Sequence, residues 1–275
     1  MIRKCTEADR AQILQLISKK PAENLFMISD IETYGFDHEI QTVWGQFEQD
    51  ELIAVLLLFS GNYIIYSETV YDAKGFSEII RATEGDFELS GIQEVVTRIR
   101  TYINFPTKRD VETYYTKCEA LAYSIEDKSY HEIEQLEAHD YEAYIEMMQS
   151  IPEFQAAAFS IERLQRAKRD GTGRTYIIKN EDGLIISAAT STAENSMAAM
   201  IVGVGTRPGY EKQGYATKIV EKLTSDLLQE NKTVCLFYSN PAAGRIYKRI
   251  GFQDIGMWSL IRYNQTLIAN GLQNK

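Results

Sequence analysis

The chain of 275 residues is poor in cysteine, histidine and proline, with 3, 3 and 5 of each. Its cysteines lie far apart in the sequence and form no CxxC pair; they are Cys5, Cys118 and Cys235. This number and spacing argue against a disulfide framework and a zinc site. The histidines have no metal-ligand spacing, and neither HExxH nor GxSxG occurs. We therefore expect no bound metal.

Positive charge is also scarce, because 29 Lys and Arg face 39 Asp and Glu, giving a formal net charge of -10. A protein that binds nucleic acid through its phosphates needs a basic surface. An acidic chain is better suited to a small cationic substrate such as an amine. We expect no nucleic-acid partner and a small-molecule or peptide amine as acceptor.

Long apolar runs are absent from the sequence. No stretch approaches the roughly 18–20 apolar residues that span a bilayer. Charges are spread through residues 1–16, so the chain does not begin with the unbroken apolar core of a signal peptide. These features predict a cytoplasmic protein with no membrane partner.

The residues that are present can build a packed core, since 44% are hydrophobic and 25% charged. The length allows two domains or one large domain. In the first half, periodicity predicts two helices followed by three strands, at residues 6–17, 21–34, 42–48, 51–60 and 63–66. The second half, from Tyr130, has a similar order of elements. Two interpretations remain open: tandem copies of one fold, or an unrelated domain beside a single α+β domain. The polar segment 124–129 is the predicted linker.

The second half contains the clearest local signals. Strands are predicted at 175–179 and 184–189, and Asp182-Gly183 between them favours a hairpin. A strand over 197–206 leads into a helix over 214–229 with a regular apolar face. A strand at 234–238, a helix at 242–249 and a final strand at 255–262 follow.

A glycine-containing loop separates the strand at 197–206 from the helix at 214–229. Free backbone amides and the helix dipole make such a helix start an anion site suited to a pyrophosphate. A nucleotide P-loop would need GK[S/T] here, and a Rossmann fingerprint would need a different spacing from Gly203 and Gly205 to Gly209. An ordinary strand–turn–helix connection remains the alternative interpretation of this loop taken alone.

A second motif follows the next strand and matches N-x-x-A-x-x-x-Y-x-x-x-G-F at Asn240, Ala243, Tyr247, Gly251 and Phe252. Together with the loop at 211–216 and the separation between the two motifs, it resembles the GCN5-related N-acetyltransferase (GNAT) family. The resemblance covers roughly residues 130–263 and is strongest over 202–252.

The resemblance implies an α+β fold with a mixed, mostly antiparallel sheet, whose two central strands splay apart and whose faces carry helices. It implies a C-terminal GNAT acetyltransferase domain over residues 130–275. Residues 1–123 form a second α/β domain, interpreted as a degenerate, non-catalytic GNAT-like copy because both motifs are missing there. Such a copy would shape the substrate cleft or provide a homodimer surface.

The resemblance also assigns roles to individual residues. Acetyl-CoA, the donor expected as co-substrate, would lie in the gap between the splayed strands. The strand end would bind the pantetheine arm together with Asn240, and the loop amides would bind the pyrophosphate. The implied cofactor-binding residues are Val204, Gly205, Thr206, Glu211, Lys212, Gln213, Gly214, Tyr215, Ala216 and Asn240. Tyr247 would protonate the departing thiolate as the catalytic acid.

The loop departs from the family pattern at its first position, where Glu211 replaces the usual Gln or Arg. A carboxylate beside a pyrophosphate is unfavourable unless it turns away, and Lys212 could supply the missing positive charge. Tyr247 has a plain alternative as a packing residue, since the chain has 17 tyrosines.

The general base is left open by the sequence, with Glu153, Glu194 and a relayed water as alternatives. Two functions also remain. The first is an N-acyltransferase that moves an acetyl group from acetyl-CoA to a primary amine by direct attack. The second is a CoA-binding or ligand-sensing protein without turnover.

Overall fold

The computed structural model describes residues 1–123, 130–155 and 157–265. Its contacts divide the chain into two compact units, Met1–Tyr115 together with Ile255–Lys275, and Thr116–Asp254. They are called unit 1 and unit 2 below. The predicted linker 124–129 lies outside the described residues.

Unit 1 has the predicted sequence of two helices followed by three strands, with the second helix starting at Leu25 rather than Pro21. Its elements are β1 (Ile2–Lys4), a 3₁₀ turn (Glu7–Asp9), α1 (Arg10–Ile17), α2 (Leu25–Tyr34), β2 (Gln41–Glu48), β3 (Glu51–Phe59), β4 (Asn62–Ser67), α3 (Ala73–Arg81), β5 (Phe87–Ile92), α4 (Gln93–Arg100), β6 (Thr107–Cys118) and β12 (Gln253–Tyr263). The strands follow the order β1-β2-β3-β4-β5-β12-β6. Strands β6 and β12 continue past the boundary, so each contributes residues to both units.

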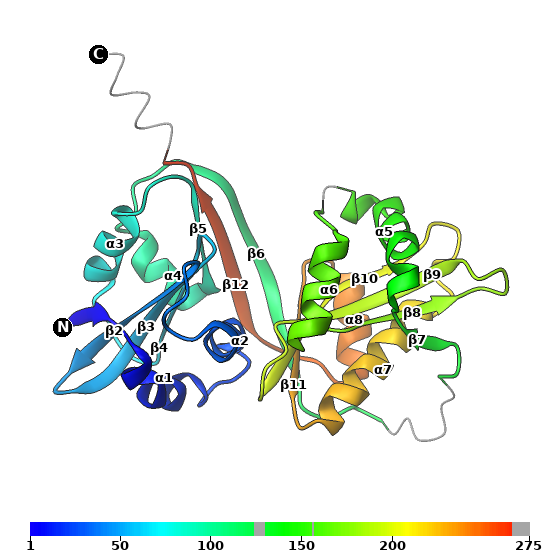
Figure 1. Ribbon diagram of the computed structural model, residues 1–275, viewed down its shortest axis with the longest axis horizontal. Coiled ribbons are helices and arrows are strands. Elements are labelled where there is room, and N and C mark those ends of the chain that lie inside the picture. The colour runs from blue at the N-terminus through cyan, green and yellow to red at the C-terminus, as the bar shows by residue number, and fades with distance from the viewer. Residues whose placement is uncertain (124–129, 156, 266–275) are drawn as a thin grey trace, which may run out of the picture. The chain divides into compact units, whose positions relative to one another are not determined.

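Strand β12 lies between β5 and β6 in the sheet (Figure 1). It pairs antiparallel with β5 from Trp258↔Ile92 to Tyr263↔Phe87. Ile261 and Tyr263 are 0% and 1% exposed, and the ring of Tyr263 stacks on Phe87 at a centroid distance of 5.0 Å. Burial of these side chains in the core of unit 1 explains why the strand joins that unit.

The domain boundary predicted from sequence therefore differs from the observed division. The sequence predicts domains over 1–123 and 130–275, whereas the contacts place residues from Ile255 onward in unit 1 and begin unit 2 at Thr116. Sequence order alone assigns β12 to the C-terminal domain, because it follows the other elements of that domain. Pairing with β5 and burial in the core assign it to unit 1 instead.

Unit 2 repeats the same order of elements. They are β7 (Ile133–Gln135), a 3₁₀ turn (Ala138–Asp140), α5 (Tyr141–Ser150), a 3₁₀ turn (Pro152–Phe154), α6 (Ile161–Asp170), β8 (Thr175–Lys179), β9 (Ile185–Thr192), β10 (Ala198–Thr206), α7 (Tyr215–Gln229), β11 (Thr233–Tyr238) and α8 (Pro241–Ile250). The strands follow the order β11-β10-β9-β8-β7, and the predicted hairpin between β8 and β9 is confirmed.

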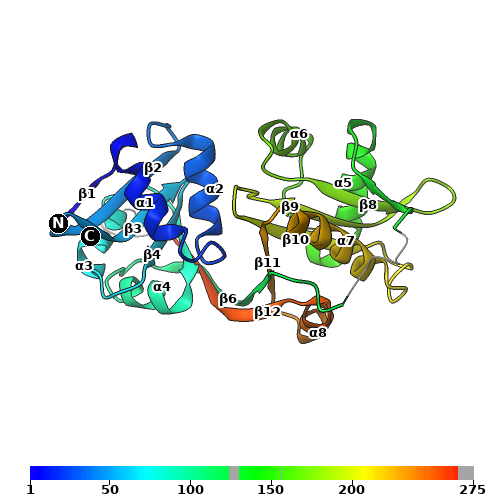
Figure 2. The ribbon, with the colours of Figure 1, turned by 90° about the horizontal axis from the view of Figure 1, so that it is seen from below.

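Helices cover both faces of the unit 2 sheet. Successive side chains of a strand point to opposite faces, so Tyr176 and Ile178 of β8 pack in the cluster that contains α7, whereas Ile177 packs in the cluster that contains α5. Figure 2 shows α7 lying along β9 and β10, which it contacts. The sheet thus holds the start of α7 next to the end of β10.

Parallel strands β10 and β11 separate within unit 2. They pair from Ala198↔Thr233 to Ile201↔Leu236 and no further, although β10 continues to Thr206. On its other side β10 pairs with β9 through a register shift between Val202 and Gly205. Such a bulge bends one strand away from its neighbour.

The same separation occurs in unit 1, where parallel β4 and β5 pair only from Asn62↔Glu88 to Ile64↔Ser90. Splayed central strands in both units confirm the predicted fold class. They also confirm that the first half contains a second copy of the fold.

Candidate active site

The gap at the end of β10 opens into a cavity of about 530 Å³ in unit 2. Its walls come from the end of β10, the loop before α7, the first turn of α7, the 3₁₀ turn after α5, and α8. The lining residues are Ile151, Pro152, Glu153, Phe154, Val204, Gly205, Thr206, Pro208, Tyr210, Glu211, Lys212, Gly214, Tyr215, Ala216, Thr217 and Ile246. All predicted cofactor-binding residues except Gln213 and Asn240 line it.

The first turn of α7 is open to an anion. Gly214 occupies the N-cap position in the left-handed conformation, with φ +87°, and has no side chain to cap the helix. The first amides of a helix have no partner within it, so those of Tyr215, Ala216 and Thr217 remain available. The helix dipole adds positive potential at the same point. A Cβ at Gly214 would meet nothing within 4 Å, so backbone conformation, not crowding, favours glycine.

The loop before α7 also shows how a glutamate is accommodated at its first position. The carboxylate of Glu211 accepts a hydrogen bond from the backbone N–H of Gly209 at 2.7 Å. The negative charge is therefore held against the preceding turn. Lys212, with φ +63°, follows it and lines the cavity. Glu211 still lines the cavity, but its carboxylate is tied to the turn at Gly209.

Strand β10, which forms one wall of the cavity, is fixed in position by contacts with β9 and with the segment after α5. The hydroxyl of Ser187 on β9 donates to the Gly205 carbonyl at 2.8 Å. A Cβ at Gly205 would lie 2.5 Å from Ile151 Cδ1 and 3.2 Å from Phe154 Cε2, so a larger residue would require both side chains to shift. Because pairing with β11 ends at Ile201, the backbone groups on that edge of β10 after Ile201 make no ladder hydrogen bonds to β11. They can offer backbone hydrogen bonds to a ligand.

Helix α8 carries the second motif. The side-chain oxygen of Asn240 caps the helix by accepting from the Ala242 N–H at 2.8 Å, which leaves its NH₂ group as a donor. Asn240 is exposed and does not line the cavity. Its capping role is a function that the sequence did not assign.

Tyr247 is half-buried and lies about two turns into α8, in an aromatic cluster. Its ring centroid lies 6.2 Å from that of Tyr238 and 6.0 Å from that of Phe252. The hydroxyl makes no hydrogen bond to any residue that the structure describes. Burial raises its pKa, so it keeps its proton at neutral pH. Ile246, the preceding residue, lines the cavity, while Tyr247 itself does not.

Several wall residues were missed by the sequence analysis. Ile151 and Phe154 come from the end of α5 and the following 3₁₀ turn, where no motif marks them. Pro152 at the start of that turn was the available signal, because it predicts a break after a helix. Ile246 could have been found from its place beside Tyr247 in the motif.

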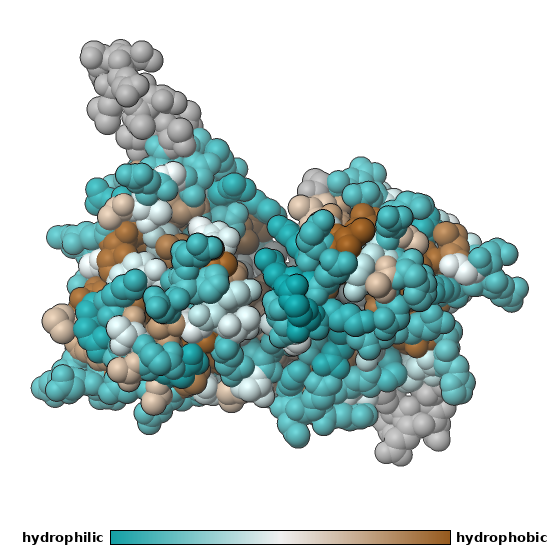
Figure 3. Space-filling model, in the orientation of Figure 1, coloured by the Kyte–Doolittle hydropathy of each residue, from teal (hydrophilic) through white to brown (hydrophobic). Residues whose placement is uncertain are grey.

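A second cavity of about 370 Å³ lies on the α5 and α6 side of the unit 2 sheet. Phe154 lines both cavities, and Val202 and Gly203 of the β10 bulge line the second one. Its walls are mainly apolar, and Figure 3 shows apolar side chains gathered where α5 and α6 lie in Figure 1. Three of the lining residues are joined by hydroxyl hydrogen bonds, Tyr144 to Thr190 at 3.1 Å and Thr190 to Thr175 at 3.0 Å.

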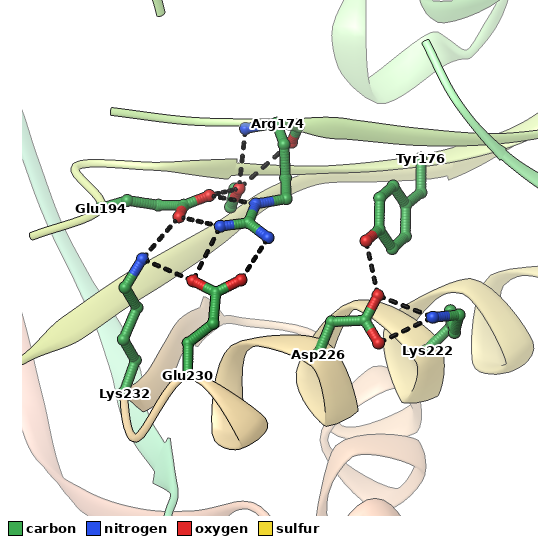
Figure 4. Close-up of polar contacts among 8 residues, drawn as sticks. Arg174, Tyr176, Glu194, Lys222, Asp226, Glu230 and Lys232 are labelled. Carbon is green, nitrogen blue, oxygen red and sulfur yellow. Dashed lines mark hydrogen bonds and ion pairs between the residues drawn. The ribbon is translucent and has the colours of Figure 1, made fainter. Parts of the chain in front are cut away.

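The two carboxylates considered as general base lie in different surroundings. Glu153 is exposed and lines the first cavity. The side chain of Glu194 is only 2% exposed and forms ion pairs with Arg174 at 2.7 Å and Lys232 at 2.9 Å. Figure 4 shows these residues around Glu194, with Glu230 on the other side of Arg174.

Glu194 is therefore a structural ion-pair residue. Burial disfavours its charged form, but hydrogen bonds from Arg174, Ser191 and Lys232 outweigh that cost and lower its pKa. A carboxylate held in this way is a weak base, and it lies outside the first cavity. Of the two carboxylates, only Glu153 lines the first cavity.

Replacing Glu194 with glutamine tests this assignment. Loss of one charge from a buried, hydrogen-bonded pair is expected to destabilise unit 2 by roughly 2–4 kcal/mol. Thermal unfolding should shift to lower temperature, while turnover, measured where the variant is folded, should stay near that of the parent. A matched Glu153→Gln variant should show the opposite pattern if Glu153 is the base. Turnover lost in Glu194→Gln at unchanged stability would contradict the ion-pair role.

Among residues 1–123, 130–155 and 157–265, no group of three or more His, Cys, Asp or Glu side chains could hold a metal ion. None of the helices described is long and apolar enough to cross a membrane.

Comparison with known proteins identifies the family of this chain. The family model of the GNAT acetyltransferases matches residues 92–261, more than half of the chain. No curated protein sequence matches the chain significantly.

Several solved structures share the fold. A Drosophila protein is 14% identical, with 95% of this chain and 98% of that one covered and a TM-score of 0.73. A GCN5-related N-acetyltransferase from Sphaerobacter thermophilus is 15% identical over 96% and 95%, with a TM-score of 0.62. A tandem GNAT protein of clavulanic acid biosynthesis is 10% identical over 96% and 98%, with a TM-score of 0.59. At these identities the likeness concerns the fold.

The family match spans β10, the loop before α7 and α8, which are the elements that build the first cavity. The family model indicates acyl transfer, and the solved structures agree with it in fold. The chain is thus an acyltransferase and belongs to the GNAT acetyltransferase family.

Proposed function

We propose that the protein transfers an acetyl group from acetyl-CoA to a primary amine by direct attack of the amine on the thioester. The observation that carries the proposal is the first cavity. It joins an open helix N-terminus, a strand edge released from its neighbour, and the helix that bears Tyr247. These parts match the anionic, amide and thioester portions of an acyl-CoA.

The loop and first turn of α7 would hold the pyrophosphate. The amides of Tyr215, Ala216 and Thr217 point out of the helix start, and Gly214 leaves space above them. Lys212 would add a positive charge. Glu211 does not oppose this role while its carboxylate accepts from Gly209.

The end of β10 would orient the rest of the donor. Backbone groups of residues 204–206 can hydrogen-bond an extended pantetheine arm much as a neighbouring strand would. One N–H of this edge would polarise the thioester carbonyl and stabilise negative charge on its oxygen during attack. The second cavity, across Phe154, would receive the body of the acceptor.

Proton transfers complete the proposed reaction. The acceptor must lose a proton to become a nucleophile, and Glu153 or a water in the cavity would take it. The amine nitrogen then forms a bond to the carbonyl carbon, the carbon–sulfur bond breaks, and the nitrogen loses its second proton to water to give the amide. Tyr247 would give its proton to the departing thiolate, since its raised pKa keeps the hydroxyl protonated.

Calorimetric titration with acetyl-CoA, together with an assay of thiol release in the presence of amine acceptors, tests the proposal. Gly214→Glu should weaken acetyl-CoA binding by roughly 10- to 1000-fold, because a carboxylate beside a phosphate costs on the order of 1–4 kcal/mol. The parent should bind acetyl-CoA and release thiol only when an acceptor is present.

Gly183→Glu is the matched control. Gly183 also has positive φ and open space around it, but it lies in the β8–β9 hairpin away from the cavity. The same substitution there should leave affinity unchanged. Equal binding by both variants and the parent would place the donor elsewhere. Binding without thiol release from any amine would favour the ligand-sensing alternative.

A further inference from the structure

Unit 1 contains its own cavity, of about 400 Å³, at the place where β4 and β5 separate. Its walls come from the turn between α1 and α2, the end of β4, the start of α4, and the beginning of β12. All of these residues belong to unit 1. The volume lies near the lower end of small-molecule sites, roughly 300–1,000 Å³, which favours a compact ligand.

The cavity is a poor match for an acyl-CoA. The helix of unit 1 that corresponds in order to α7 is α3, and its N-terminus is closed by Asp72, whose carboxylate accepts from the Gly75 N–H at 2.8 Å. A capping carboxylate occupies the amides that would bind a phosphate and repels a second anion. In unit 2 the corresponding position is the uncapped Gly214.

An unsatisfied polar group lies in the cavity wall. Tyr66 is 4% exposed and lines the cavity, yet its hydroxyl makes no hydrogen bond of ordinary length and angle to a described residue. Burial and the nearby carboxylates of Glu68 and Glu23 raise its pKa, and the adjacent Asn24 side chain lowers the pKa by less, so it stays a neutral hydroxyl. The Asn24 side-chain oxygen, also buried, lacks a partner among the described residues as well. A buried hydroxyl without a partner costs free energy, which a polar ligand would recover.

The charges around the cavity are of both signs. Acidic side chains come from the α1–α2 turn, the residues after β4 and the first turn of α4, namely Glu23, Glu68 and Glu94. Glu68 also pairs with Lys19 at 3.1 Å, through one of its two carboxylate oxygens. Lys20 and Arg98 contribute positive charge, and the Arg98 guanidinium is held over the cavity by donating to the Thr69 carbonyl at 3.2 Å. Helix α4 begins at the wall without a side-chain cap, so its first amides face the same space.

We propose that this cavity binds a compact zwitterion, a free α-amino acid being the simplest member of the class. Arg98 and the first amides of α4 would bind the carboxylate. Glu23, Glu68 and the Tyr66 hydroxyl oxygen would accept hydrogen bonds from the ammonium group. The site is separate from the acetyl-transfer site and does not depend on the function proposed for it.

The test uses the 275-residue chain and each of the standard L-α-amino acids individually. Thermal unfolding and calorimetric titration are measured without acetyl-CoA. At least one amino acid should bind, and at a hundredfold excess over Kd it should raise Tm by roughly 5–10 °C. Arg98→Gln should weaken that binding by roughly 10- to 100-fold, because it removes a charged hydrogen-bond donor.

Tyr66→Phe provides a readout that a packing role would not give. Without ligand, the variant should be as stable as the parent or more stable, since it loses a buried hydroxyl that makes no hydrogen bond of ordinary geometry to Asn24 or Glu68. Its affinity for the amino acid should nevertheless fall by roughly tenfold or more. Arg100→Gln is the matched control, because it removes the same charge from α4 at a position outside the cavity wall. Its affinity should equal that of the parent.

Three results would overturn the proposal. The first is that no amino acid binds the parent. The second is that binding survives both Arg98→Gln and Tyr66→Phe, which would place the amino acid at another site. The third is that Arg98→Gln weakens acetyl-CoA binding, which would make the cavity a donor site. Because the readout is amino-acid binding, none of these results requires that acetyl transfer occur.

Discussion

Replacing Tyr247 with phenylalanine is expected to lower turnover by roughly 10- to 1000-fold, the range usual for one proton-transfer group. The ring packs against Tyr238 and Phe252 and is retained, while the hydroxyl makes no hydrogen bond to the described residues. Stability should therefore change little. Affinity for acetyl-CoA should also stay close to that of the parent, because the proton is needed only as charge develops on sulfur.

The measurement is steady-state thiol release with a good acceptor, beside calorimetric titration of acetyl-CoA. A donor whose leaving thiol is more acidic should show a smaller loss, since its thiolate needs less protonation. Tyr238→Phe is the matched control: it removes a hydroxyl from the neighbouring ring, one that donates to Asp254 at 2.9 Å. Its turnover should match the parent. Unchanged turnover in Tyr247→Phe, with chemistry rate-limiting, would show that Tyr247 only packs.

A chain that ends after Asp254 is expected to lose the folded structure of unit 1. The truncation removes most of β12 from between β5 and β6, and with it the ladder from Trp258 to Tyr263. Ile261 and Tyr263 leave the core cluster of unit 1, where each is almost fully buried. Losing two large core side chains costs roughly 5–10 kcal/mol, comparable to the whole stability of a domain.

Hydrogen exchange measures this loss segment by segment. The amides of β4 and β5 should exchange rapidly in the truncated chain and slowly in the parent. A chain ending at Gln265 is the control, because it keeps all of β12. Acetyl-CoA binding should persist wherever unit 2 stays folded, since the first cavity is lined only by residues of that unit. Slow exchange in β5 of the truncated chain would contradict the structural role of β12.

The local elements of the fold could be predicted from the sequence because their signals are local. Asp182-Gly183 predicts the β8–β9 hairpin through the turn that it allows. The apolar face of residues 214–229 predicts α7, and the loop before it predicts a helix start with free amides. The helix starts at Leu25 rather than Pro21 because residues 21–24 form a turn before it.

The candidate site could be predicted only in part. The loop and strand residues lie together because they are adjacent in sequence, so the motif already implies their proximity. Ile151 and Phe154 reach the same cavity from a separate segment, and only packing against Gly205 brings them there. Asn240 illustrates the opposite case, because its side-chain oxygen caps α8 although the motif assigns it to the donor. Glu194 looked like a base candidate in sequence, and Arg174 and Lys232 make it an ion-pair residue.

The sequence by itself determined the family, the strand–loop–helix geometry at Gly214 and the repeated order of elements in the two halves. Those features depend on short-range backbone preferences and on motifs of fixed spacing. Tertiary structure alone decided that β12 pairs in unit 1, because a strand offers hydrogen bonds on both edges and sequence does not say which neighbour accepts them. It also decided that the unit 1 gap is lined by charges of both signs and an unpartnered Tyr66, since these residues come from segments that only folding brings together.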